Sequence, residues 1–295
     1  MTHGKSGDGG AIPVSGAIDA HVHVMPERLL EAVRESLTAA VGWEFDHPTR
    51  REAIENVLRQ HGIERYITLP YAHKPGIASD LNNWVCAQAR QSDMCLPFAT
   101  VHPADDVGQV VREAFENGAC GLKFQCPVQE VSPEDPRLDP AYECCIEFDC
   151  PVLHHAGTAP MFEDSQHVGI ERFTAFRERF PDVRACCAHM GTFEHEAFIE
   201  VARDDENVFL DTSFAMAEVP DSDLAFTPAS IDDRVFEDLA GQILYGSDYP
   251  NLPHTYRQEY AGLVNRELSN EAQQSLFRGA TEQFLGDGYT SRPKL

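Results

Sequence analysis

The sequence predicts an α/β protein whose parallel strands close into a (β/α)8 barrel, or TIM barrel, and three observations lead to this prediction. Short apolar segments alternate with longer amphipathic segments from about residue 16 to residue 285. Eight of the apolar segments have the length of strands and are apolar throughout, which is typical of strands buried on both faces of a parallel sheet. No glycine-rich phosphate loop follows the first of them, which disfavours the competing fold, an open doubly wound sheet.

The expected strands and helices follow one another in strict alternation. The strands are expected at residues 17–22, 65–69, 94–101, 119–124, 151–155, 183–189, 208–211 and 242–246. The helices are expected at residues 50–61, 81–91, 107–117, 142–148, 171–180, 194–203, 233–239, 256–268 and 270–278. Alternation of this kind gives parallel strand order. Eight such units in a chain of this length most simply close into one barrel.

The 295 residues are expected to form a single domain. Residues 1–15, rich in glycine and small polar side chains, are predicted to be a disordered leader, and residues 16–295 the barrel. Two long segments interrupt the alternation, at about 25–49 after the first strand and 213–232 after the seventh. Both begin where strands end, so they either form a lid or specificity loops or merely fill the barrel mouth.

The composition argues against several classes of partner. The chain has 48 acidic and 23 basic residues and a formal net charge of −25, which disfavours binding to nucleic acids and to anionic membranes. No segment resembles a membrane-spanning helix or a secretory signal, and the nine cysteines show no CxxC spacing. We therefore expect a cytoplasmic protein with reduced, buried thiols. Its expected partner is a small molecule, and a homodimer would be ordinary.

Histidine and aspartate side chains recur at the ends of the expected strands. His21 and His23 are two residues apart on an extended segment, so both imidazoles project to the same side. His155, His189 and Asp248 follow three other apolar segments in the same way. Imidazoles with a carboxylate are a ligand set that suits a divalent cation such as zinc.

The fifth expected strand ends in two adjacent histidines, His154 and His155. Because side chains alternate along a strand, one of them must point into the barrel and the other toward the surrounding helices. Alternation alone leaves open which of the two faces the candidate metal site.

Taken together, four motifs resemble the amidohydrolase superfamily, and in particular its amidohydrolase-2 branch with the decarboxylases related to aminocarboxymuconate semialdehyde decarboxylase. The motifs are the DxHxH opening at residues 19–23, His155-Ala-Gly, His189-Met-Gly and Tyr245-Gly-Ser-Asp248-Tyr-Pro. The resemblance covers residues 18 to about 284. It implies one divalent metal ion, usually zinc, held by His21, His23, His155 and Asp248. Nitrogen and oxygen ligands of this kind also accept manganese. In mononuclear members, the histidine that corresponds to His189 acts on the substrate.

Lys123, at the end of the fourth expected strand, leaves three interpretations open, one of which is that its stem merely covers apolar surface. In superfamily members with two metal ions, a carboxylated lysine at this place bridges them, which would recruit His189 as a ligand. The Gly121-Leu-Lys123 arrangement resembles the mononuclear branch more, in which the lysine would bind a carboxylate of the substrate. Tyr71, His102 and Gln125 follow other strand ends and are further candidates for substrate binding.

These residues predict a metal-dependent hydrolase that cleaves an amide, lactone or ester bond of a small, carboxylate-bearing substrate. A zinc ion lowers the pKa of bound water toward neutrality. Asp248 would transfer the proton, and His189 would polarise the scissile carbonyl or steady the oxyanion. The alternative is a metal-dependent non-oxidative decarboxylase, or a hydratase, of an unsaturated or aromatic acid. The related decarboxylases are often longer than this chain, which favours the hydrolase modestly.

Overall fold

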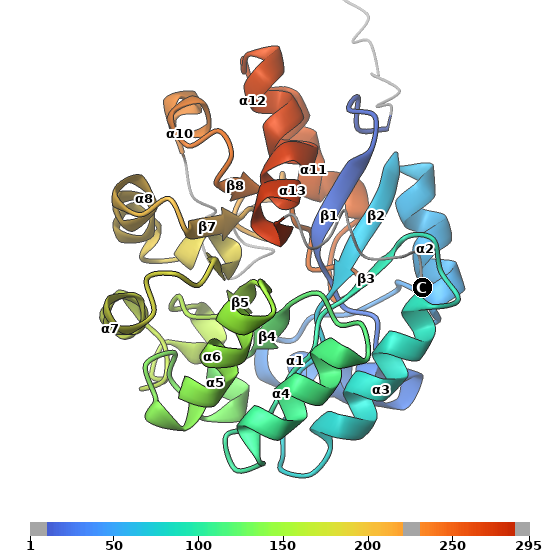
Figure 1. Ribbon diagram of the computed structural model, residues 1–295. Helices are drawn as coiled ribbons and strands as arrows, with labels where there is room; N and C mark the ends of the chain where they lie inside the picture. The colour runs from blue at the N-terminus through green and yellow to red at the C-terminus, as the bar shows by residue number, and fades with distance from the viewer. Residues whose placement is uncertain (1–10, 221–230, 287–295) are drawn as a thin grey trace, which may run out of the picture.

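The strands of the barrel lie at the centre of the structure, a computed structural model that describes residues 11–220 and 231–286. The described residues contain eight strands, which are parallel neighbours in chain order (Figure 1). They are β1 (Ala17–Val22), β2 (Ile63–Thr68), β3 (Cys95–Pro97), β4 (Leu122–Phe124), β5 (Val152–His154), β6 (Ala185–Cys187), β7 (Val208–Asp211) and β8 (Ile243–Leu244).

The strands form two sheets, β1 to β3 and β4 to β8, and backbone hydrogen bonds join the two sheets at both seams. Beyond β3, the N–H of Ala99 donates to the carbonyl of Gly121 over 2.8 Å. At the other seam, the N–H of Ala20 donates to the carbonyl of Tyr245, also over 2.8 Å. The predicted (β/α)8 barrel is therefore confirmed.

The helices surround the strands (Figure 1). They are α1 (Glu27–Val41), α2 (Arg51–Gln60), α3 (Ala78–Ala89), α4 (Val107–Glu116), α5 (Cys126–Gln129), α6 (Asp139–Glu147), α7 (Ile170–Arg179), α8 (His195–Asp204), α10 (Asp233–Asp238), α11 (Tyr256–Val264), α12 (Asn270–Gln274) and α13 (Ala280–Leu285). Short helical turns are η1 (Pro136–Leu138), η2 (Pro160–Phe162), η3 (Ala188–Gly191) and η4 (Ser275–Gly279). Side-chain caps fix the residues at which several helices begin. At α4, for example, the side chain of Asp106 accepts the N–H of Gln109 over 3.2 Å.

Several boundaries differ from those predicted. The strand predicted at 183–189 ends at Cys187, because the chain turns at His189 into the left-handed region, with φ of 56°. The segment at 25–49 contains the helix α1, which was not predicted. Ile12 and Val14, inside the predicted leader, are buried. Most of that leader and residues 221–230 of the second predicted insertion lie outside the described residues.

The strand register divides the side chains into an inner and an outer layer. Lys123 pairs with Leu153, Leu153 with Cys186, and Cys186 with Phe209 along four neighbouring strands. Residues in register on parallel strands point to the same face. Leu153, Cys186 and Phe209 belong to the apolar cluster inside the barrel, so Lys123 also points into the barrel.

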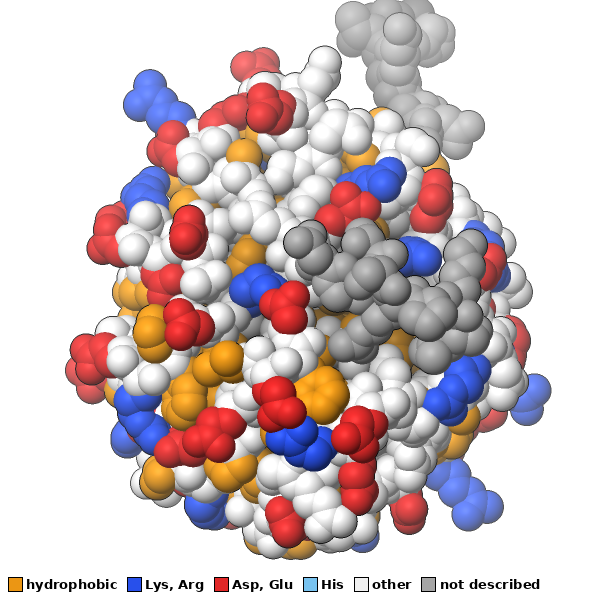
Figure 2. All heavy atoms as spheres, in the orientation of Figure 1, with side chains coloured by type: hydrophobic (Ala, Val, Ile, Leu, Met, Phe, Trp, Pro, Cys, Tyr) orange, Lys and Arg blue, Asp and Glu red, His pale blue; other side chains and the backbone are white. Residues whose placement is uncertain are grey.

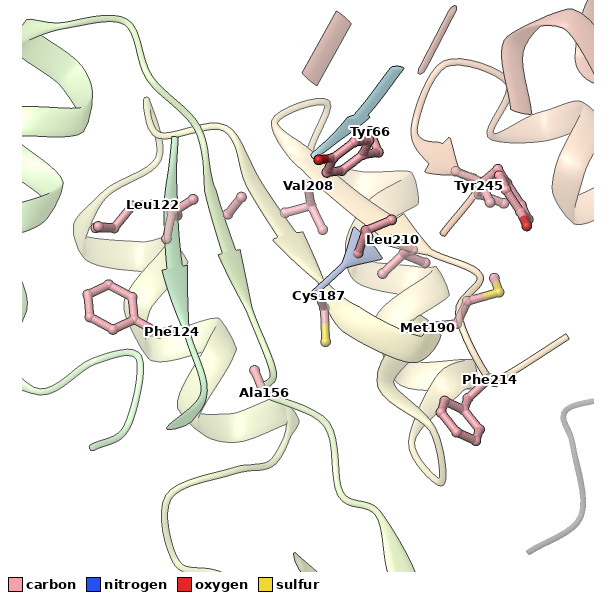
Figure 3. Close-up of a cluster of buried hydrophobic side chains, with 14 of the residues drawn as sticks. Tyr66, Leu122, Phe124, Ala156, Cys187, Met190, Val208, Leu210, Phe214 and Tyr245 are labelled. Atoms are coloured by element: carbon pink, nitrogen blue, oxygen red, sulfur yellow. The ribbon is translucent and has the colours of Figure 1, made fainter. Parts of the chain in front are cut away.

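The outer layer packs against the helices. Figure 3 shows part of it, with Leu122, Cys187, Val208 and Leu210 among the labelled side chains. These residues alternate in sequence with the inner ones, so both faces of the sheet are apolar and buried. This double burial explains why the strands read as continuous apolar segments.

Charged side chains cover the surface. Figure 2 shows acidic side chains spread over the visible face, with lysine and arginine between them. Some form exposed ion pairs, such as Arg112 with Glu147 at 2.5 Å, which contribute little to stability. No helix in the described part of the chain is long and apolar enough to span a bilayer. All nine cysteines are buried, as expected.

Candidate metal centre

Three side chains from the first and last strands meet at the carboxyl end of the barrel. The Oδ1 atom of Asp248 lies 3.2 Å from Nε2 of His21 and 2.8 Å from Nε2 of His23. One ligand atom from each of the three residues lies within 4.8 Å of the others. His21 and His23 are buried, and the Asp248 side chain keeps 17% of its surface exposed. Two imidazole nitrogens and a carboxylate oxygen that face one point can hold a divalent cation.

The closure of the barrel positions these side chains. The backbone N–H of Asp248 donates to the carbonyl of His21 over 2.8 Å, and the N–H of His23 donates to the carbonyl of Tyr249 over 2.7 Å. The two histidines and the aspartate, more than 220 residues apart in the chain, are therefore fixed to each other by the strand pairing itself.

Hydrogen bonds set the protonation of the two imidazoles. Nδ1 of His23 lies 2.7 Å from the carbonyl oxygen of Leu69, and Nδ1 of His21 lies 2.9 Å from Oδ2 of Asp211. Both partners only accept, so each Nδ1 carries the proton and each Nε2 presents a lone pair toward Asp248. Lone pairs that face each other at such distances require a cation between them, either a proton or a metal ion. The donor set therefore fits a divalent ion.

His155 is oriented by a second chain of contacts. Nδ1 of His189 lies 3.1 Å from the carbonyl oxygen of Ser213, so this nitrogen carries the proton. Nε2 of His189 therefore accepts from Nδ1 of His155, 3.1 Å away. Nε2 of His155 is then left with a lone pair, and it is buried without a hydrogen-bond partner. Such an atom is suited to a metal ion, although His155 lies outside the cluster of His21, His23 and Asp248.

The structure resolves the choice between the two adjacent histidines. His155 lines the cavity above the three converging residues. His154 points the other way, where its Nε2 lies 3.0 Å from the hydroxyl of Tyr142 and its ring stacks on Phe124. The alternation of the strand therefore assigns His154 to the outer core.

Asp211 and Ser213 belong to the site, although sequence reasoning did not single them out. Asp211 is fully buried, and its carboxylate accepts from Nδ1 of His21, the hydroxyl of Ser213 and the N–H of His189. The signal for Asp211 was present, because it ends the seventh expected strand. Ser213 carries no comparable signal.

Burial and close charges shift the pKa values at the centre. Burial opposes the charged form of His21, but the carboxylates of Asp211 and Asp248 raise its pKa to about 8. Burial would raise the pKa of Asp248, yet its contacts with His21 and His23 hold it well below the usual range. Burial lowers the pKa of His189 to about 4. Before any metal binds, a proton on Nε2 of His21 would therefore occupy the place that faces Asp248, and a metal ion would displace it.

Backbone strain is concentrated at the site. His189, Thr192, Phe214 and Asp248 all have positive φ, between 49° and 66°, and all four line the cavity. Residues other than glycine adopt such angles at an energetic cost, and this cost tends to gather at functional positions.

A cavity of about 370 Å³ opens over the centre. Tyr71 and Gln125, both predicted to bind substrate, line it. Lys123 does not line it: its side chain is fully buried in the barrel, and its Nζ has no hydrogen-bond partner. His102 is also not among the lining residues, and its Nδ1 instead accepts the N–H of Ala104 over 3.2 Å. Two of the four side chains predicted to bind substrate therefore reach the cavity.

Comparisons with known proteins agree with this fold. A family model described as amidohydrolase matches residues 18–286. An uncharacterised TIM-barrel protein from Bordetella bronchiseptica has a similar structure, with a TM-score of 0.73 and 18% identity over 92% of this chain and 99% of that chain. A search of curated proteins found no match.

Two similar structures are of enzymes with described activities. One is 5-carboxyvanillate decarboxylase from Novosphingobium aromaticivorans in complex with manganese and a nitrobenzoic acid (TM-score 0.61, 16% identity, 94% of this chain and 97% of that chain). The other is 4-oxalomesaconate hydratase from Rhodopseudomonas palustris (TM-score 0.60, 15% identity, 91% and 95%). At these identities, the likeness concerns the fold.

Proposed function

Because the chain belongs to the amidohydrolase family, we propose that it is a metal-dependent enzyme that removes carbon dioxide from a small carboxylic acid without an oxidant. The observation that carries this proposal is the convergence of His21, His23 and Asp248 beneath a cavity with mainly apolar walls. The similar structures of a decarboxylase and a hydratase support this choice over the hydrolase predicted from the sequence.

Four residues would hold the ion: His21, His23 and Asp248, together with His155 through its unpartnered Nε2. A divalent ion, zinc or manganese, would supply a Lewis acid at this place. We expect one ion, because the second possible ligand set among the described residues, His21, His189 and Asp211, shares His21 with the first and is already joined by the hydrogen bond between His21 and Asp211.

The residues of the chain would perform the remaining tasks. In decarboxylation, the bond between the carboxyl carbon and its neighbour breaks, and the electron pair remains on the neighbouring carbon, which takes up a proton. We assign the transfer of that proton to Asp248, which reaches the cavity from beside the two imidazoles. Because its carboxyl group is ionised, Asp248 would first take the proton from water or from an acidic group of the substrate. His189, fixed by Ser213, would orient the substrate. The apolar walls would exclude water from the carboxylate that is lost.

Hydrolysis of a lactone, ester or amide is the second candidate. The observation that favours it is the partly exposed carboxylate of Asp248, which is placed to take a proton from an attacking water molecule. The two reactions make different products, so one screen separates them.

Elemental analysis of the purified protein and of His21→Ala tests the proposal. We expect about one zinc or manganese per chain, which His21→Ala loses while His167→Ala, altered outside the cavity, keeps it. The loaded protein is then supplied with aromatic and unsaturated acids and, separately, with lactones and amides. Release of carbon dioxide supports the decarboxylase, and hydrolysis supports the second candidate. Two ions per chain would point to a carboxylated Lys123, and failure to take up any metal would refute both candidates.

A further inference from the structure

The helix α1 directs an apolar stripe at the cavity instead of at the core. Its residues that line the cavity are spaced three and four apart, which places them on one helical face. They are Leu29, Ala32, Val33, Ser36, Leu37, Ala40 and Val41. Of the fifteen residues of α1, only Leu30 is buried. A surface helix ordinarily buries its apolar stripe against the core. The stripe of α1 instead faces the cavity that opens over the candidate metal centre.

Two aromatic rings continue the apolar wall. Trp43, just beyond α1, stacks on Phe214, with ring centroids 5.3 Å apart and planes 11° apart. Phe214 is fixed in turn, because its backbone N–H donates to Oε2 of the fully buried Glu259 over 3.0 Å. The wall is therefore built from both sides of the barrel mouth.

Arg34 holds α1 in place over the centre. Its guanidinium donates to the carbonyl of His47 over 2.7 Å and to the carbonyl of Pro250 over 2.9 Å. Pro250 lies two residues after Asp248. The helix that forms the wall is thus tied to the loop that carries a metal-binding carboxylate.

The lining offers almost no charge for recognition away from the centre. Among the described residues that line the cavity, Asp248 is the only carboxylate, and none is lysine or arginine. A ligand that extends beyond the centre can therefore gain affinity chiefly by burying apolar surface.

We propose that α1 recognises a hydrocarbon arm of the substrate: the substrate is a carboxylic acid whose acid group lies at the metal centre and whose apolar arm lies along α1. The placement of the acid group at the metal centre rests on the proposed function. The placement of the apolar arm rests on the stripe of α1 and on the pair of Trp43 and Phe214. Ala40 and its neighbours on the stripe then determine how long an arm the cavity accepts.

Calorimetric titration of the metal-loaded protein with straight-chain acids, from butanoate to octanoate, tests the inference. Each added methylene is expected to strengthen binding about fourfold until the arm fills the cavity. Ala40→Phe fills the cavity from α1, so it should weaken octanoate binding by about tenfold or more and leave butanoate unchanged. Ala39→Phe is the matched control, because Ala39 and Ala40 are both exposed neighbours on α1 and only Ala40 lines the cavity.

The outcomes separate this inference from the proposed function. Affinity that does not depend on chain length, or equal effects of Ala39→Phe and Ala40→Phe, would refute the role of α1 and leave the metal centre untouched. The uncharged 1-octanol distinguishes the two ends. If 1-octanol binds as tightly as octanoate and is sensitive to Ala40→Phe, the role of α1 stands and the acid end fails. If neither octanoate nor 1-octanol binds, the inference is wrong.

Discussion

Atoms outside the candidate metal centre decide which imidazole nitrogen is available to an ion. The carbonyl oxygens of Leu69 and Ser213 and the carboxylate of Asp211 each fix one ring proton, on His23, His189 and His21 respectively. If one of these acceptors were lost, the ring proton could move to the other nitrogen. An N–H that repels a cation would then replace the lone pair. The chemistry of the centre therefore depends on residues that would not touch the ion.

Replacing Asp211 by asparagine should weaken metal binding. The amide keeps the shape of the side chain, but it loses the charge that holds the proton on Nδ1 of His21. Losing such a partner typically lowers metal affinity by about 10-fold to 100-fold. Competition for zinc against a chromogenic chelator would measure the change.

The matched control is Asp93→Asn. The Asp93 side chain is 87% exposed, and among the described ion pairs it contacts only Arg59, which is not part of the centre. It should leave zinc affinity unaltered. Equal affinities for Asp211→Asn and the unmodified protein would show that Asp211 does not orient His21.

At this scale, the sequence predicted which residues converge but not how they are connected. His21, His23 and Asp248 could be found because strand ends of a barrel share one face. The pairing of His155 with His189 could not, because it depends on the left-handed turn at His189. Lys123 was expected to bind a carboxylate of the substrate. Its side chain does point into the barrel, but alternation along a strand does not show how deep in the barrel a side chain lies.

Among the elements, the loops after β5 and β6 depend on each other. Thr158 and Thr192 form a parallel bridge between them. A Cβ atom added at Gly157 would lie 2.5 Å from the backbone of Gly191, so the loops that carry His155 and His189 approach closely only because glycine lies at the contact.

Gly157→Ala should therefore destabilise the protein. The clash is with backbone atoms, which cannot rotate away, and overpacking of this kind typically costs about 1–3 kcal/mol. Urea denaturation would measure the loss in the free energy of unfolding.

Gly279→Ala is the comparison, since a Cβ there would have no neighbour nearer than 3.8 Å and its φ is helical, at −60°. It should leave stability unchanged or raise it by up to about 1 kcal/mol. A Gly157→Ala variant as stable as Gly279→Ala would mean that the two loops can separate without cost.

Arg34→Ala should loosen α1 selectively. A hydrogen bond to a charged group contributes about 1.5 kcal/mol or more, so amide hydrogen exchange in α1 should become about tenfold faster or more, while exchange in α4 and α8 should not change. Arg28→Ala, on an exposed position of the same helix, is the control. If both variants exchange alike in α1, the anchoring by Arg34 is unimportant.

The helix α1 shows what an element's sequence does and does not contain. The spacing of Leu29, Val33 and Leu37 has the period of a helix, so α1 could have been predicted within the segment at 25–49. The contacts of its apolar face could not have been predicted, because the sequence pattern of an apolar stripe is the same whether the stripe packs on a core or lines a cavity.

At the scale of the whole molecule, the packing of helices and strands protects the thiols. All nine cysteines are buried, and burial raises the pKa values of Cys145, Cys186 and Cys187 well above the usual range. At pH 8, a chromogenic disulfide reagent should therefore react with fewer than about one thiol per folded chain at early times. After denaturation in urea, all nine should react, and rapid reaction of several thiols in the folded protein would contradict the packing described here.

The barrel closes where its first and last strands meet, and this has a consequence for synthesis on the ribosome. His23 and Asp248 are 225 residues apart. At the usual rates of translation, roughly 10 to 45 s pass between them. During that time, the growing chain carries two imidazoles without the carboxylate that completes their site, and β1 without its final neighbour. A message truncated before codon 248 therefore yields a chain that holds the first half of the cluster but lacks the residue that completes it.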